Sequence, residues 1–509
     1  MCGPFAFLEI KKMSTTQNTI DLMKGALAAA DDALSKTVST GTGLVAYDLQ
    51  APAKNLYPVN TPIRNIIPRV SGGTGLATNW RQVSAITGSG FDGSGWVPEG
   101  QRSGRMSYTT ANKAATYVTL GEEDQVTFEA VSAARTFEDI QATATMRMMQ
   151  KLFLKEESAL LGGNTSLALG TTPTPTLSAA GSGATLPAAT YSVICVALTY
   201  EGFRNSSLAG GVATSLSITG ADGQTYTLNG GSAQKSSAGS QAVTLGQTLS
   251  CSVAAVRGAV AYAWFIGASG SEKLEKITTI NSTTFSAALV GTYQAASALT
   301  AADYSRNTTV PAFDGLLTNA FISSNGAYFN SLATGTAGTG TSLTSSNRGS
   351  IVEIDTMLQA MWDNYQVSPT AFFVNSQELK NITTKVLTNG SGPLLQYFAD
   401  PSVGARVVAA GGGIEFYYNP FCMGSGIKIP IMIHPNVPAG TIVAYCDNLP
   451  AQYLSNNVPN VAEVKTRVDY YQIDWPLRTR AREFGVYTEQ VLAVYAPFTL
   501  GVITNIANG

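Results

Sequence analysis

The side chains that could do chemistry are few in this chain and far apart. His434 is the single histidine, and histidine is the side chain most often used as a general base or metal ligand near neutral pH. As a catalytic base it would need a serine or cysteine nucleophile and an orienting acid, and no G-x-S-x-G motif accompanies it. It precedes Pro435 in an apolar, strand-like run, so we expect a structural histidine.

Arginines make the second candidate group. Arg478, Arg480 and Arg482 alternate in a strand-like stretch, which would place three guanidinium groups on one face about 6.6 Å apart. They could meet phosphates or carboxylates. Because the formal charge of the chain is only -2, we expect ion pairs within or between subunits rather than nucleic-acid contacts.

Two further patterns are weaker. The acidic triplet at 122–124 would need convergent oxygens from elsewhere to hold a metal, so we expect a solvated turn before a strand. Gly88, Gly90 and Gly93 satisfy G-x-G-x-x-G, but Pro98 follows and no helix opens there, as a dinucleotide site requires. A hairpin turn is the better interpretation.

The five cysteines are scattered, with no C-x-x-C pair, and predict no zinc site. They are Cys2, Cys195, Cys251, Cys422 and Cys446. A bridge between Cys195 and Cys251 is conceivable, but their apolar surroundings favour reduced, buried thiols.

Composition points to structure more than catalysis. Charged residues make up 13% of the 509 residues, about half the usual share of ~25%. Fifty glycines, with abundant Ser, Thr and Ala, indicate a turn-rich, largely β chain. We predict no enzymatic turnover, no cofactor and no metal. No apolar run approaches the ~18 residues of a membrane span, and Lys11 and Lys12 follow the first apolar stretch, the reverse of an export signal.

The first third of the chain predicts an arm, a long hairpin and a long helix. Residues 1–60 hold one amphipathic stretch, Ile20–Leu34, and a proline-interrupted segment. Strand-like runs at Arg81–Ile86 and Ala114–Leu120 flank a glycine-rich middle, which predicts a hairpin up to ~60 Å long. Such a ribbon is marginal alone in water, so it should lie against its own domain or a neighbouring copy. A helical pattern then runs over Ala133–Leu161 and ends at Gly162-Gly163.

Residues 165–310 have about half the charge density of the rest and predict a separate β-sandwich. Its expected strands are 189–200, 216–218, 226–228, 259–266, 274–280 and 284–287. The sequence segments 183–191 and 257–265 resemble segments of immunoglobulin-like and fibronectin-type modules.

After this insert the chain resumes a mixed pattern, typical of an α+β body. A capping box of Ser350 and Glu353 begins a helix to about Asn364. A strand (370–374), a second helix (376–387) and four strands (428–434, 440–446, 464–473 and 485–495) are expected to follow.

The order of these elements resembles the major capsid proteins of tailed bacteriophages, with the Hong Kong phage type of shell fold. The likeness is carried by Gly95-Trp-Val-Pro-Glu-Gly-Gln, by 128–134 leading into the long helix, by Pro311-Ala-Phe-Asp-Gly-Leu, and by the closing run from Val468 to Pro497. It covers about residues 60–164 and 311–505.

This resemblance implies a domain plan. Residues 1–60 would be an N-terminal arm, 61–164 the extended loop and the spine helix of a peripheral domain, and 165–310 an inserted immunoglobulin-like sandwich. Residues 311–460 would be mainly an axial domain, and 461–509 would return to the peripheral domain. Some relatives crosslink a lysine to an asparagine; Lys113 could be that lysine, but an exposed, solvated lysine is the expected state.

The function implied is self-assembly into an icosahedral shell of hexamers and pentamers in the virion capsid, built in the host cytoplasm. Separate scaffolding and portal proteins would be partners, and packaged DNA a non-specific content. The insert would project outward and could touch host surfaces or glycans; no membrane is involved. Two rivals stay open: a β-rich surface adhesin or layer protein, and a glycan-active enzyme with an appended sandwich.

Trp96 and Glu99 at the hairpin tip are the strongest candidates for subunit contact. An exposed tryptophan beside a carboxylate, in a ribbon unable to fold alone, is typical of a contact surface. Arg478, Arg480 and Arg482 are the further contact candidates.

Overall fold

The computed structural model describes residues 57–87, 96–135, 138–346, 349–388, 397–399, 406–408, 413–422, 427–450, 453 and 460–507. The chain separates into two compact units, one of residues 1–57 with 134–138 and one of 58–133 with 139–509. The predicted helix at 20–34, Cys2 and the three glycines of the G-x-G-x-x-G pattern lie outside the described residues. The second unit is described below, and its mixture of helices and strands confirms the α+β class.

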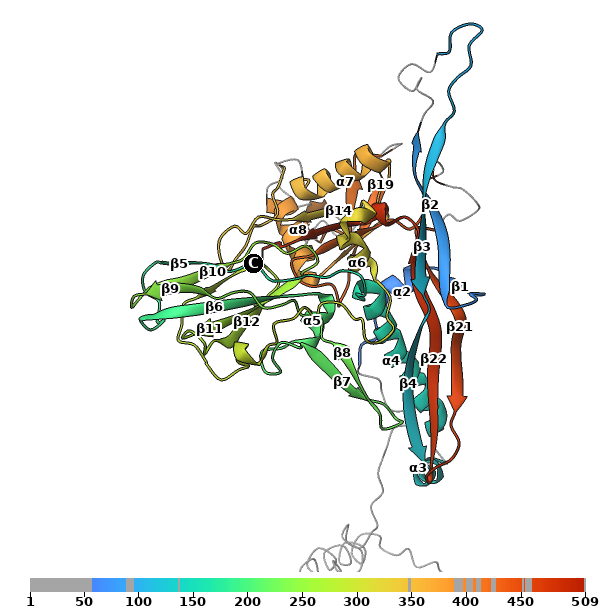
Figure 1. Cartoon of the computed structure of the whole chain (residues 1–509), viewed down its shortest axis with the longest axis horizontal. Helices are drawn as coiled ribbons and strands as arrows, with labels where there is room; N and C mark the ends of the chain where they lie inside the picture. Colours follow the sequence, from blue (N-terminus) through green and yellow to red (C-terminus); the bar gives the residue numbers. More distant parts are fainter. Residues whose placement is uncertain are drawn as a thin grey trace, which may run out of the picture. The chain divides into compact units, whose positions relative to one another are not determined.

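A four-stranded sheet and one long helix form the first layer pair of this unit. The strand order is β1-β21-β22-β4. The strands are β1 (Arg69–Val70), β4 (Val118–Thr127), β21 (Ala462–Asp474) and β22 (Ala481–Val494). Helix α4 (Ile140–Gly162) covers one face, where Met148 and Leu152 pack on Phe484 and Val486 (Figure 1).

The long helix is shorter than its pattern predicted. The sequence predicts one helix over 133–161, whereas the structure has α3 (Phe128–Ala134) and a separate α4. Asp139 is the cause, because its side chain accepts the backbone N–H groups of Gln141 (3.1 Å) and Ala142 (3.2 Å) and so begins a new helix. The predicted end at Gly162 is confirmed; a Cβ there would come within 2.1 Å of the Tyr200 ring.

The predicted hairpin is present as a two-stranded ribbon. β2 (Ala77–Thr87) pairs with β3 (Ser107–Thr116), from Ala77 opposite Thr116 to Thr87 opposite Ser107. The second strand lies about seven residues earlier than predicted, because Tyr117 is buried and the chain passes there from the ribbon into β4. Figure 1 shows the ribbon running on beyond the four-stranded sheet from which it starts.

Two sheets enclose the core of the insert. One has the order β13-β10-β5 and the other β12-β11-β6-β9. The strands are β5 (Thr176–Ala180), β6 (Ala189–Leu198), β9 (Gly239–Val243), β10 (Thr248–Ser252), β11 (Ala261–Gly267), β12 (Lys273–Thr278) and β13 (Ser282–Phe285). A short helix α5 (Tyr200–Asn205), a 3-10 turn η3 (Ala296–Ala298) and a second ribbon of β7 (Ser215–Thr219) with β8 (Thr225–Asn229) complete it.

The prediction of reduced thiols is confirmed for the four described cysteines, which are all free. Cys195 and Cys251 pack with Trp264 in the core of the insert. Burial raises the pKa of the Cys251 thiol to about 12, so these groups behave as small apolar side chains.

A six-stranded sheet of order β14-β23-β20-β15-β19-β18 forms the rest of the unit. Its strands are β14 (Tyr328–Ser331), β15 (Ala371–Val374), β18 (Phe416–Asn419), β19 (Ile427–Ile433), β20 (Ile442–Tyr445) and β23 (Gly501–Thr504). The helices around it are α2 (Pro62–Ile66), α6 (Leu316–Phe321), α7 (Val352–Tyr365) and α8 (Ser376–Thr388), with 3-10 turns η4 (Ser323–Asn325) and η6 (Pro497–Thr499). A separate pair joins β16 (Tyr397–Ala399) to β17 (Arg406–Val408).

Two predictions about this region need correction. The helix after Ser350 exists, but its N-cap is Ile351 without a side-chain cap, and Glu353 accepts the N–H of Thr344 instead (2.9 Å). β21 and β22 lie in the four-stranded sheet, whereas β23 joins the six-stranded sheet, so the segment from 461 onward serves both sheets. No helix among the described residues is long and apolar enough to cross a membrane.

A buried pair of asparagines joins the insert to the six-stranded sheet. The Asn281 backbone N–H donates to Asn505 Oδ1 (2.9 Å), and Asn505 Nδ2 donates to Asn281 Oδ1 (3.0 Å) and to the Leu332 carbonyl (2.7 Å). Asn505 adopts a left-handed backbone conformation (φ 63°), which asparagine tolerates better than most residues. This pair anchors the sandwich to the body.

Asn505→Ala should lower the free energy of unfolding by about 2–4 kcal/mol, because it leaves buried polar groups unpaired and strains the backbone. Thermal and urea unfolding measure this loss. Asn79→Ala, at an exposed position of β2, is the matched control and should change stability by less than about 0.5 kcal/mol. Equal stabilities of the two variants would contradict the anchoring role.

Candidate contact surfaces

The ribbon of β2 and β3 exposes large apolar side chains for most of its length. Val83, Ile86, Met106 and Tyr108 are each more than 60% exposed, and Ile86 lies directly opposite Tyr108. In the described part of the ribbon the packing lies at the base, where the Trp80 and Tyr495 rings make a T-shaped contact at 5.5 Å between centroids. An isolated two-stranded ribbon with an open apolar pair is marginal in water, so this surface lacks the partner that would stabilise it.

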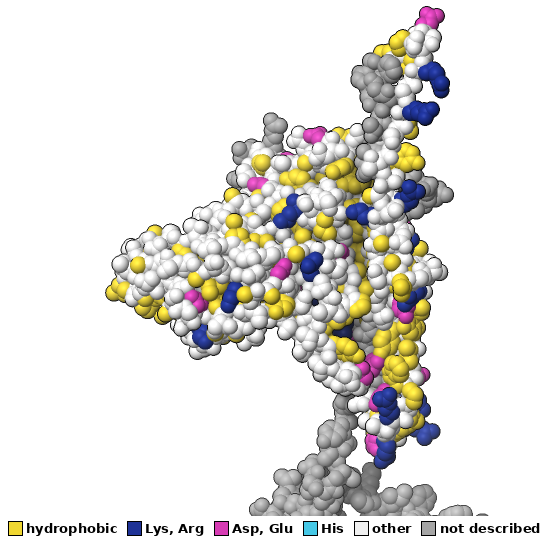
Figure 2. Space-filling view, viewed as in Figure 1, with side chains coloured by type: hydrophobic (Ala, Val, Ile, Leu, Met, Phe, Trp, Pro, Cys, Tyr) yellow, Lys and Arg dark blue, Asp and Glu magenta, His cyan; other side chains and the backbone are white. Residues whose placement is uncertain are grey.

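The two tip residues predicted from sequence, Trp96 and Glu99, are both exposed. Trp96 is 80% exposed. Glu99 is exposed and sits in a turn closed by the Gln101 N–H and the Pro98 carbonyl (3.1 Å), with Gly100 at φ 77°. That geometry is a type II turn, which holds the Glu99 side chain outward. Figure 2 shows acidic and basic side chains gathered at this end of the ribbon.

The arginines lie elsewhere, at the turn between β21 and β22. The prediction of one strand face is wrong, because β22 begins only at Ala481. All three arginines are exposed. Arg480 pairs with Glu129 of α3 (2.7 Å) and Arg482 donates to Gln141 of α4 (3.1 Å). Two of the three therefore tie this turn to the helices of the same chain.

The structure does not bring the two candidate groups together. β4 starts beside the ribbon base and runs for ten residues along β22, from Gln490 to Ala481. Ten strand residues span about 33 Å, so the arginine turn and the ribbon lie at opposite ends of this sheet (Figure 1). They cannot form one binding site within a chain.

The acidic triplet lies inside β4 and not in a turn, which corrects that prediction. Glu122 pairs with Lys155 of α4 (2.6 Å), and Glu123 accepts the hydroxyl of Tyr487 on the neighbouring strand. Their partners are side chains of the same sheet and helix. Among the described residues no group of three or more histidine, cysteine or acidic side chains gathers to hold a metal ion.

The sequence did not predict two fully buried carboxylates on α4, Glu156 and Glu157. Glu157 accepts the backbone N–H groups of Ile63 (2.9 Å) and Arg64 (2.8 Å) at the start of α2. It also meets His434 Nε2 at 2.5 Å. His434 Nδ1 accepts the N–H of Asn436 (3.1 Å), so Nε2 is the protonated nitrogen and donates to the carboxylate. The buried, fully partnered ring is the structural histidine expected.

Glu156 holds the neighbouring segments. It accepts from Arg64 Nε (2.8 Å), from the guanidinium of Arg69 and from the hydroxyl of Tyr470. Burial raises the pKa of the Tyr470 hydroxyl, and the nearby Glu156 carboxylate raises it further. The sequence did contain a signal for the burial of Glu156. Met148, Leu152 and Glu156 are spaced four residues apart, so they lie on the same buried face of the helix, where a charged side chain is unusual.

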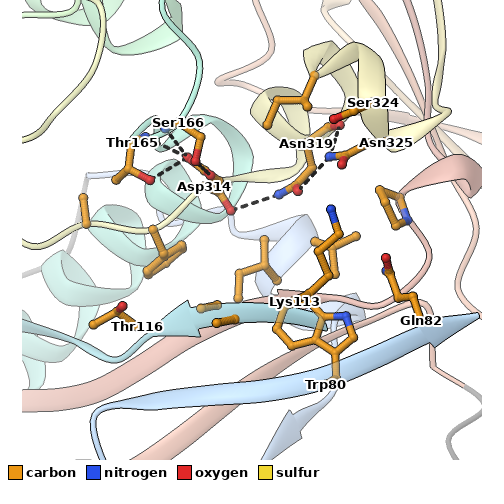
Figure 3. A pocket seen from close by; sticks show the side chains of 18 residues that line it. Trp80, Gln82, Lys113, Thr116, Thr165, Ser166, Asp314, Asn319, Ser324 and Asn325 are labelled. Atoms are coloured by element: carbon orange, nitrogen blue, oxygen red, sulfur yellow. Dashed lines mark hydrogen bonds between the residues drawn. The ribbon is translucent and has the colours of Figure 1, made fainter. Parts of the chain in front are cut away.

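A cavity of about 330 Å³ lies at the ribbon base (Figure 3). Its walls come from the ribbon, the insert boundary, α6 with η4, and the end of β22. Its polar lining residues include Trp80, Gln82, Lys113, Asp314, Asn319 and Asn325. Lys113 is half-buried and points into this cavity, which corrects the expectation of a fully solvated lysine.

Two carboxyl groups, Asp314 and Glu201, lie at the root of the insert. Asp314 Oδ1 accepts the N–H and hydroxyl of Thr165 (2.7 and 2.8 Å) and the N–H of Ser166 (3.1 Å). Glu201 of α5 lies nearby, and burial raises its pKa to about 7, opposed by Arg204 and reinforced by Asp314. Burial outweighs the opposing effects of Arg204 and of the Asn164 backbone, so the protonated form of Glu201 is favoured below about pH 7.

No family model matches this chain, and no curated protein matches it. Solved structures similar to it include the capsid of a native GTA particle computed with C5 symmetry, at 10% identity and TM-score 0.42, covering 93% of this chain and 100% of that chain. The capsid of Myoviridae phage XM1 is similar at 8% identity and TM-score 0.39, and the match covers 92% of this chain and 98% of that chain. A structure of Mycobacterium phage Bobi is similar at 10% identity and TM-score 0.40, and the match covers 92% of this chain and 97% of that chain. At these low identities and TM-scores, we base the proposals below on the residues and contacts of the chain itself.

Glu201→Gln should stabilise the protein at pH 8 by roughly 1–3 kcal/mol and leave it unchanged near pH 4. The folded carboxyl titrates at about 7, above its ordinary value of 4.5, so between these values the folded state holds a proton that the unfolded chain releases. Stability from this group is therefore lost as the pH rises from about 4.5 to 7.

Thermal unfolding at pH 4 and pH 8 measures this difference. Glu415→Gln, at an exposed position, is the control and should show no such difference between the two pH values. A Glu201→Gln variant less stable than the parent at pH 8 would show that the carboxylate is instead favourably paired.

Proposed function

We propose that this chain is the major capsid protein of a tailed bacteriophage, which self-assembles into the icosahedral shell around the genome. The observation that carries the proposal is the ribbon of β2 and β3, whose apolar residues stay open to water along its length. Obligate assemblies commonly bury more than ~2,000 Å² per interface, and an extended ribbon supplies such area where a compact body would not. No turnover is part of this function.

The proposed domain plan assigns the elements to an extended loop, a peripheral domain, an axial domain and an insert; β23 departs from it, because it joins the six-stranded sheet. Residues 61–164 supply the extended loop (β2 and β3) and the spine helix (α4), and residues 311–460 mainly supply an axial domain around the six-stranded sheet. β21 and β22 return to the peripheral domain, and residues 1–60 would form the arm. The two-sheet insert at 165–310 is proposed to be an immunoglobulin-like module.

Partners follow from this role. Copies of the chain meet as hexamers and pentamers in the virion capsid after assembly in the host cytoplasm, with separate scaffolding and portal proteins. Packaged DNA is a non-specific content, since the chain has no excess of basic residues. The sandwich is proposed to face outward and to touch host surfaces or glycans; its sparsely charged surface in Figure 2 suits contact with neutral polar groups.

Replacing residues 84–109 with Asn-Gly should abolish shell formation but leave the body folded. The parent chain should give closed particles by electron microscopy, and the shortened variant only small species by analytical ultracentrifugation. Trp80, Gln82 and Lys113 stay in place, so the unfolding temperature of the unassembled protein should change by less than about 2 °C.

A parent chain that purifies as a compact, monodisperse monomer would overturn the proposed function. Sheets or fibres would instead favour a surface-layer protein. Shells from the shortened variant would show that the ribbon is not the main contact.

Deleting the insert should destabilise the body, because the insert completes its hydrogen bonds. Asn281 pairs with Asn505, and Arg257 Nε donates to the Phe321 carbonyl of α6. Replacing 165–310 with a short linker should therefore give aggregated or protease-sensitive protein. Deleting only 215–229, the exposed second ribbon, is the control and should leave solubility unchanged. Stable shells from the full deletion would show that the insert is purely decorative.

A further inference from the structure

The cavity at the ribbon base contains hydrogen-bond donors without acceptors. Within the described part of the chain, the Trp80 indole N–H is buried and has no hydrogen-bond partner. Lys113, directly opposite Trp80 in the ladder, forms no ion pair with any described carboxylate. Figure 3 shows its side chain rising from β3 into the cavity above the indole ring. A buried donor without a partner is unfavourable, and a carboxylate can accept from an ammonium and an indole N–H together.

Asp314, the carboxylate on the cavity wall, is already satisfied. Both of its oxygens accept hydrogen bonds from Thr165 and Ser166 at the boundary of the insert. It holds that boundary closed and leaves the lysine unneutralised. The acceptor that fits the cavity must therefore come from elsewhere.

The ribbon tip carries a carboxylate suited to this cavity. Glu99 is exposed, forms no hydrogen bond or ion pair with a described residue, and is presented by the tight turn of 98–101. The neighbouring Trp96 is 80% exposed and supplies a large apolar surface beside the carboxylate. The cavity volume of about 330 Å³ accommodates one such polar side chain.

A tip cannot fill the cavity of its own chain. The ladder runs from Trp80 opposite Lys113 to Thr87 opposite Ser107, and seven strand residues span about 23 Å. The ribbon thus holds its own Glu99 away from its own Lys113. The carboxylate has to come from a second copy.

We propose that Glu99 of one copy enters the ribbon-base cavity of the next copy, where Lys113 and the Trp80 N–H bind its carboxylate. The contact joins two different surfaces of the same chain, so each copy offers one tip and one cavity. Heterologous contacts of this kind close into rings when the rotation between copies permits. This inference rests on the proposed function and names the receptor surface of its ribbon.

Exchanging the charges of Glu99 and Lys113 tests the contact between the tip and the cavity. Glu99→Lys alone and Lys113→Glu alone should each reduce the yield of assembled rings or shells at least tenfold, because like charges then meet in a confined site. The double variant Glu99→Lys/Lys113→Glu should recover at least half of the parent yield. Lys151→Glu, on the exposed face of α4, is the matched control and should assemble as the parent does. Unfolding temperatures of the unassembled variants verify folding.

If Lys113→Glu does not fold, Lys113→Gln replaces it in the test, because it removes the cation without adding a negative charge. The yield of assembled rings or shells from Lys113→Gln should fall several-fold. Single variants that assemble like the parent, or a double variant that fails to recover while folded, would overturn the tip-in-cavity contact and leave the shell proposal intact. A parent chain that never assembles would instead refute the proposed function.

Discussion

Two adjacent carboxylates buried on one helix hold the described unit together. Glu157 binds the first N–H groups of α2 and the imidazole of His434, and Glu156 binds Arg64, Arg69 and Tyr470. Removing one partner from a buried ionic cluster leaves an uncompensated charge and commonly costs about 3–5 kcal/mol. Through these contacts α4 fixes the start of α2, the strand that leads into the ribbon, and the end of β19.

This anchoring allows the ribbon to remain open. β1 is held to β21 by pairing and to α4 by Arg69, and the chain enters β2 only seven residues later. The exposed apolar side chains of the ribbon contribute little to the folding of the body while they face water. The same side chains can then contribute to association, where burying them is favourable. Folding and assembly thus draw on separate sets of apolar residues.

Elements with a long, regular pattern could be predicted from the sequence. The spine-like helix, the ribbon, six strands of the insert and the thiol state of the described cysteines follow from periodicity and composition. The short strands β5, β9 and β10 of the insert were not predicted. Two element boundaries were predicted wrongly. Asp139 caps a new helix inside an apparently continuous helical pattern, and the buried Tyr117 lies where the chain passes from the ribbon into the four-stranded sheet.

The functional side chains divide in the same way. Exposure of Trp96 and Glu99 could be inferred locally, because glycines and a proline surround them. The arginine turn could not, since its contacts with Glu129 and Gln141 join residues more than 300 positions apart. The walls of the cavity around Lys113 likewise come from five separate stretches of chain, 80–82, 113–116, 165–166, 312–325 and 492–497, and no local sequence pattern predicts that these stretches lie together.

The position of β23 bears on biosynthesis. This strand, residues 501–504, lies between β14 and β20 inside the six-stranded sheet, and its side chains are fully enclosed. Until residues 501–504 have been synthesised, β14 has no neighbouring strand in this sheet and cannot join β20, β15, β19 and β18. Prematurely terminated products would be left with two unpaired sheet edges, which makes them targets for proteolysis and keeps defective copies out of any larger structure.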